Sequence, residues 1–156
     1  MRILTPADIS LAPLPAEGGE APMQSRVVQG GLPLQARVDG LVLEAAFECR
    51  GFHLLFTTDD VPQEDLLHIT LFDGQWQPLD AATIGGAYTT GRFSLIGLEG
   101  EHTVRFRFIG DTDWSVEILP SPGFRMPLVS EPRGVTRALG FSRHFVVRGD
   151  PQPQGR

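Results

Sequence analysis

The sequence HTVRFRFIGDTDWSVEIL, residues 102–119, decides the fold class. Apolar residues occupy every second position on both sides of the polar residues 110–113. A period of two is typical of a β-strand with one buried face, and two such runs around a polar turn predict a β-hairpin. We expect either Arg105 or Arg107 to lie opposite Glu117, because both simple registers pair opposite charges across the strands.

The same alternation predicts strands in the middle of the chain. Between Leu41 and Cys49 the odd-numbered residues are apolar, Arg50-Gly51 supplies a turn, and residues 52–57 supply a partner strand. Further strand candidates are Leu67–Phe72, Trp76–Leu79, Ala87–Leu98 and Phe141–Val147. Because no long amphipathic helix competes, we predict an all-β fold, an antiparallel β-sandwich or partly closed barrel of about six to nine strands.

Proline placement divides the chain. Of the 13 prolines, only Pro62 and Pro78 lie within residues 34–119. Since proline lacks a backbone donor, it is excluded from central strands. We therefore expect an extended, Pro-rich N-terminal arm over residues 1–33, irregular and solvated in residues 1–25, and a core β domain over 34–119. The last segment, 120–156, is rich in Pro and Arg, and we expect it to supply a closing strand to the same domain.

Composition excludes several classes of protein. The 156 residues carry a net charge of −6, which argues against a nucleic-acid partner. One cysteine, Cys49, rules out an intrachain disulfide. No apolar run has the length of a secretory signal or a membrane span, so we expect a cytoplasmic protein with no membrane partner. All 13 basic residues are Arg, which we attribute to GC-rich coding in a bacterium.

Motifs for catalysis or metal binding are absent from the sequence. The four histidines have no metal-ligand spacing, and the chain has neither a nucleophile elbow nor a lysine. We predict no cofactor, no metal and no catalytic residue. A hydrolytic or metal-dependent enzyme stays open as an alternative if histidines converge with the acidic run at Asp59, Asp60 and Asp65.

Two groups of residues are candidates for binding. Tyr88 and Arg92 lie in the Gly- and Thr-rich run 83–92, and with Trp76 they could line a pocket or groove, since these residue types are enriched at binding hot spots. Arg105 and Arg107 share one face of the 102–119 hairpin, where their charge can steer an acidic partner.

Residues 98–106, LEGEHTVRF, resemble the corner before the penultimate strand of bacterial immunoglobulin-like and related sandwich domains. This resemblance covers only these nine residues of the 156 and implies a sandwich.

The leading hypothesis is a non-enzymatic protein that binds another protein through a strand edge, an arm or an Arg-bearing face. An inhibitor of the immunity type, an adaptor and an assembly subunit, including a homo-oligomer, all fit this reading. The alternatives are a sandwich that binds a small molecule or a carbohydrate through Trp76, Tyr88 and Arg92, and the enzyme considered above.

Overall fold

The computed structural model describes residues 1–16, 18–19, 22–61, 64–86, 91–123, 131–137 and 143–152. Within these residues there are thirteen strands and no helix. The strands form three antiparallel sheets, none of which closes into a barrel. The predicted all-β, sandwich-like fold is confirmed, but with more strands than the six to nine expected.

The central sheet has six strands in the order β1 (Arg2–Ile3), β5 (Val42–Cys49), β6 (Phe52–Thr58), β7 (Leu67–Phe72), β8 (Pro78–Ile84) and β12 (Val135–Thr136). The second sheet has four strands in the order β13 (Arg143–Arg148), β11 (Trp114–Gly123), β10 (Thr103–Arg107) and β9 (Ser94–Glu99). The third has three strands in the order β2 (Ile9–Pro13), β3 (Gln24–Gln29) and β4 (Leu32–Asp39).

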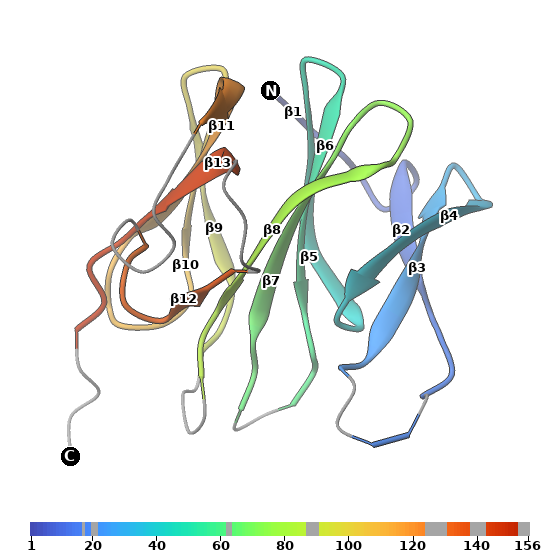
Figure 1. Ribbon diagram of the computed structural model, residues 1–156, viewed down its shortest axis with the longest axis horizontal. Helices are drawn as coiled ribbons and strands as arrows, with labels where there is room; N and C mark the ends of the chain where they lie inside the picture. Colours follow the sequence, from blue (N-terminus) through green and yellow to red (C-terminus); the bar gives the residue numbers. More distant parts are fainter. Residues whose placement is uncertain are drawn as a thin grey trace.

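The sheets stack in three layers, with the six-stranded sheet in the middle (Figure 1). A larger core fills the space between the six-stranded and four-stranded sheets, and a smaller core lies against the three-stranded sheet. The larger core includes Phe47, Phe56, Ile69, Val104, Phe106, Trp114 and Phe145. The smaller core includes Leu4, Ile9, Val27, Val38, Leu55 and Phe72. The six-stranded sheet is therefore covered on both faces.

Strand β6 lies inside this arrangement and is buried on both faces. Phe56 points into the larger core, where its ring makes edge contacts with Phe47 at 5.7 Å and Phe106 at 5.2 Å between centroids. Leu55 points the other way and is fully buried in the smaller core. The sequence pattern predicted one buried face for this strand, and the third sheet is the reason that there are two.

The predicted β5–β6 hairpin is confirmed. Its two-residue turn is Arg50-Gly51, with φ of 51° and 83°, which suits a turn whose two central residues both have positive φ. A bulge at Glu44 shifts the register, so that Leu43 packs against the smaller core while Ala45 packs against the larger one. The single inward face expected for odd-numbered residues from 41 to 49 is therefore interrupted at residue 44.

The β10–β11 hairpin is also confirmed, but both predicted registers are wrong. Glu117 lies opposite Thr103, and Phe106 lies opposite Trp114. The connection is longer than a tight turn because Phe108 and Ile109 leave the ladder and are buried in the larger core. The indole Nε1 of Trp114 donates to the carbonyl oxygen of Ile109 at 2.9 Å, which fixes this longer connection.

The N-terminal residues are not an irregular extension. They form β1, β2 and β3, and Leu4, Ile9 and Val27 are buried in the smaller core. Apolar residues spaced among the prolines allow this packing, since Pro13 ends a strand and does not interrupt one. The boundaries suggested by proline placement, after residues 33 and 119, fall inside β4 and β11.

The C-terminal segment contributes two strands, β12 and β13, each to a different sheet. Arg137, just after β12, is enclosed by both sheets: its guanidinium lies 3.1 Å from Asp80 and 2.9 Å from Glu131, and 4.3 Å above the ring of Phe145. All three ionic side chains are nearly buried. This charge cluster ties the segment to β8.

Candidate protein-binding edge

The outermost strand of the four-stranded sheet, β9, is paired on one side only. It pairs with β10 and is the last strand in the sheet order, so within the described residues its other edge has no strand partner. Three of its large apolar side chains are exposed, Leu95 by 37%, Ile96 by 43% and Leu98 by 36%. An unpaired edge carrying apolar side chains offers backbone donors and acceptors to an added strand.

Local sequence explains how β9 comes to lie there. Gly100, with φ of 65°, provides the positive φ that turns the chain from β9 into β10. After this turn, Cys49 Sγ at the end of β5 lies 3.3 Å from the carbonyl oxygen of Glu101 and donates to it. The β9–β10 connection is thereby held against β5. Residues 98–106, expected as a corner, are a hairpin within one sheet.

A bulge decides which side chains β9 presents. Arg105 pairs with Gly97 while Phe106 pairs with Leu95, so Ile96 is the extra residue and has no cross-strand partner. Leu95 and Leu98 share the face of Phe106 and Val104, toward the larger core. The two leucines thus form the rim of that core, and Ile96 extends the rim into solvent.

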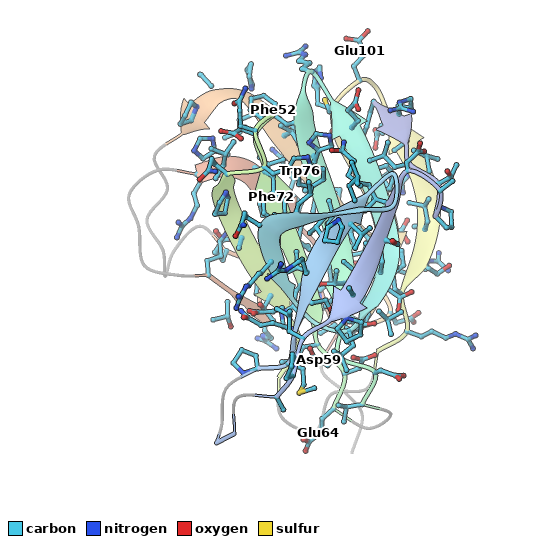
Figure 2. All side chains as sticks on the ribbon, turned by 90° about the vertical axis from the view of Figure 1, so that its right-hand side faces the viewer. Phe52, Asp59, Glu64, Phe72, Trp76 and Glu101 are labelled. Atoms are coloured by element: carbon cyan, nitrogen blue, oxygen red, sulfur yellow. The ribbon has the colours of Figure 1, made fainter. Side chains whose placement is uncertain are left out.

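The neighbouring edge of the six-stranded sheet is short and adds an apolar residue. Strand β1 pairs with only two residues of β5, at Glu48 and Phe47. Ile3 on β1 is 52% exposed. Figure 2 shows β1 and β9 along the same side of the molecule. We call this side, defined by Ile3, Leu95, Ile96 and Leu98, the open side.

Arg105 and Arg107 lie on the outer face of β10 and are engaged by acidic side chains. Arg105 Nη2 is 2.7 Å and Arg107 Nε is 2.9 Å from the carboxylate of Asp113, and Arg105 Nε is 3.7 Å from Glu99. The hydrogen bond from Arg107 is the main cause that holds the pKa of Asp113 below its usual range. The outer face beside β9 therefore carries balanced charge.

The other sequence candidates are separated in space. Trp76 is half-buried and stacks on His53 with 4.0 Å between ring centroids, against the smaller core (Figure 2). Arg92 is exposed and its backbone N–H donates to Phe108, on the other side of the six-stranded sheet. Tyr88 lies outside the described residues. The structure does not bring Trp76 and Arg92 into one pocket.

One histidine does meet a carboxylate, as the enzyme alternative requires. His68 Nε2 lies 2.8 Å from Asp59 Oδ1, and His68 Nδ1 lies 3.2 Å from Thr83 Oγ1. His68 and Thr83 are direct cross-strand partners, so these bonds join β7, β8 and the residue after β6. None of the three residues lines any of five cavities found in the described residues, with volumes of about 160 to 550 Å³. The arrangement is explained by its structural role in the sheet.

The described residues contain no group of three or more His, Cys, Asp or Glu side chains placed to hold a metal ion. They include no helix with the length and apolar character needed to cross a membrane.

Comparisons with protein-family models, with curated proteins and with solved structures find no match to this chain. Sequence reasoning placed a strand at Ala87–Leu98 but did not identify it as an edge. The signal that could have indicated an edge is the run Leu95-Ile96-Gly97-Leu98, in which apolar residues do not alternate with polar ones and glycine interrupts the strand.

Proposed function

We propose that this protein is a protein-binding module that receives an extended segment of a partner protein along β9. The observation that carries the proposal is the edge of β9, which has no strand partner among the described residues and carries Leu95, Ile96 and Leu98 exposed. In such strand addition, backbone hydrogen bonds supply affinity and alternate side chains supply specificity. A partner strand that pairs with β9 can also bury its apolar side chains against Leu95, Ile96 and Leu98.

Four of the other five sheet edges support the choice of β9 because they carry features that discourage pairing, and the fifth, β13, begins and ends with arginine. Strand β4 has Pro33, Arg37 and Asp39, and β2 ends at Pro13. Strands β1 and β12 have two residues each. Proline, charge and short length are the means by which proteins protect sheet edges. Strand β9 is six residues long and has Glu99 as its one charged residue.

Charge at the open side favours a partner segment that is apolar and weakly charged. Arg105 and Arg107 are already paired with Asp113 and Glu99. A highly charged segment would have to disrupt these pairs or leave its own charges unpaired. We therefore expect recognition by apolar side chains on alternate positions of the partner strand.

The test compares the tagged wild-type protein with the double variant Leu95→Lys/Leu98→Lys and with Leu32→Lys. Leu32 is 72% exposed on β4, so its variant places a lysine on a different sheet edge. Proteins retained from the native lysate are identified, and the binding of each is then measured with purified components. We expect a partner that binds wild type and Leu32→Lys alike and binds the double variant about tenfold or more weakly.

Hydrogen exchange of the purified complex locates the contact. Amides of β9 should exchange more slowly in the complex, while those of β4 should not change. Protection at β4 instead, or a partner that binds the double variant as tightly as wild type, would contradict the proposal. If wild type is a dimer that the double variant converts to a monomer, the occupant of the edge is a second copy and the proposed foreign partner is wrong.

A further inference from the structure

The outer face of the three-stranded sheet carries two arginines in direct opposition. Arg26 on β3 and Arg37 on β4 are cross-strand partners. The preceding pair, Ser25 and Val38, is buried against the smaller core, so the two arginines point away from it. Figure 2 looks onto this outer face. Like charges directly opposite each other across a sheet are destabilising.

No acidic side chain in the described part of the chain pairs with either arginine. Within the described residues, no ion pair or side-chain hydrogen bond involves either guanidinium, although Arg2, Arg105, Arg107, Arg137 and Arg148 all form ion pairs. Arg26 Nε is buried without a hydrogen-bond partner. The nearby carboxylate of Asp39 accepts instead from Gln24 Nε2 at 3.0 Å. A buried guanidinium N–H without an acceptor is costly.

A cavity of about 270 Å³ opens beside Arg37, while Arg26, its cross-strand partner, does not line it. Arg37 and Gln24 line it together with apolar side chains from the β2–β3 connection and its neighbours, Leu14, Pro15, Pro22 and Met23. The volume is slightly below the usual range for small-ligand sites, roughly 300–1,000 Å³, so only a small ligand fits. The lining combines a cationic end with an apolar wall.

We propose that Arg26 and Arg37 bind the carboxylate of a small organic acid whose apolar portion occupies this cavity. Guanidinium groups bind carboxylates through paired, charge-assisted hydrogen bonds, and an anion here offsets the repulsion between the two arginines. The apolar wall explains why an organic acid fits the site better than an inorganic anion. This site is on a different sheet from β9 and is independent of the proposed function.

The test measures binding of hexanoate to the full-length protein by calorimetry and by NMR of the arginine Nε–Hε signals. Hexanamide and inorganic phosphate are the matched probes, because the first lacks the charge and the second lacks the apolar chain. We expect hexanoate to bind most tightly and to shift the Arg26 Nε–Hε signal. Equal binding of hexanamide would overturn the role of the arginine pair, and equal binding of phosphate would overturn the role of the cavity.

Variants separate the arginine pair from general surface charge. Arg26→Gln/Arg37→Gln should weaken hexanoate binding about tenfold or more, whereas Arg133→Gln, which removes an exposed arginine elsewhere, should leave it unchanged. The ligand-free double variant should unfold at a temperature no lower than wild type, because a like-charge pair is removed. A double variant that is folded and binds hexanoate as tightly as wild type contradicts the proposal.

An internal counterion is the main competing explanation. Glu17 and Glu20 belong to the β2–β3 connection in the sequence and lie outside the described residues. If hexanoate binds only after Glu17→Gln/Glu20→Gln, the arginines are neutralised by the chain itself and the proposed ligand is wrong. If hexanoate binds wild type and this double variant within about twofold, the external-ligand proposal stands.

Discussion

Strands β6 and β9 are both rich in apolar residues, yet they have opposite environments. In β6, six of the seven residues are buried, whereas in β9 every residue except the half-buried Gly97 is exposed. The difference comes from position: β6 has strands on both sides and a sheet over each face, while β9 has β10 on one side. Apolar content therefore maintains stability in one strand and is available for binding in the other.

Phe56→Ala should have the largest effect on stability. Its ring lies among Phe47, Phe93 and Phe106, with centroids 5.2 to 5.7 Å away, in the larger core. Truncation leaves a cavity that the covered sheet cannot close, so we expect a loss of about 3–5 kcal/mol in the free energy of unfolding. Urea denaturation followed by circular dichroism measures it. A loss of about 1 kcal/mol or less would mean that β6 is not the centre of the core.

Leu55→Ala tests the opposite face of the same strand. Leu55 is fully buried in the smaller core, so we expect a loss of about 2–4 kcal/mol by the same measurement. A strand with one buried face would lose about 0.5 kcal/mol or less at this position. The result therefore decides whether the three-stranded sheet packs on β6 in solution.

Leu95→Lys/Leu98→Lys tests the edge strand. Both leucines are partly exposed, and a lysine chain can lie along the rim with its charge in water, so we expect the free energy of unfolding to change by about 1 kcal/mol or less. Partner binding should nevertheless fall as proposed above. A large loss of stability would show instead that β9 contributes to the core as β6 does, and its exposed leucines would then need no partner.

Asp113→Asn should have the smallest effect, and one that depends on pH. Because the folded pKa of Asp113 is below its ordinary value, its carboxylate stabilises the fold above the pKa of the unfolded chain. That contribution is lost as pH falls through the folded pKa. We expect the stability difference between wild type and variant to be constant from about pH 8 to about pH 5 and to shrink below about pH 4. Urea titrations across this range measure the difference. A difference that stays constant to the lowest pH would contradict the pairing of Asp113 with Arg105 and Arg107.

The alternating pattern of the sequence predicted the hairpins, but it did not predict which distant segments pack against them. The alternation around Arg50-Gly51 identified the β5–β6 hairpin, because a two-residue turn places the last residue of β5 directly opposite the first residue of β6. The register of β10 and β11 was missed because Phe108 and Ile109 bury themselves in a core made by other strands. The first 25 residues contain four prolines and were predicted to be solvated, because the pattern did not show the sheet against which Leu4 and Ile9 pack.

The candidate protein-binding edge was also predicted only in part, because its contacts depend on distant segments. A strand near residues 94–98 was predicted, but its role as an edge depends on the sheet order. Arg26 and Arg37 are 11 positions apart in the sequence, and nothing in their spacing indicates that β3 and β4 place them side by side. Arg105 and Arg107 were identified from alternation, while their pairing with Asp113 required the longer connection after β10.

The sequence by itself determined that this protein is all-β, since the two-residue period and the turn residues act through local sterics and hydrogen bonding. Tertiary structure alone decided which apolar strand is central and which is open. It also decided contacts such as Arg137 with Asp80, 57 positions apart, and β1 with β5. The physical reason is that burial and strand pairing depend on which distant segments meet, and neither alternation nor composition specifies that order.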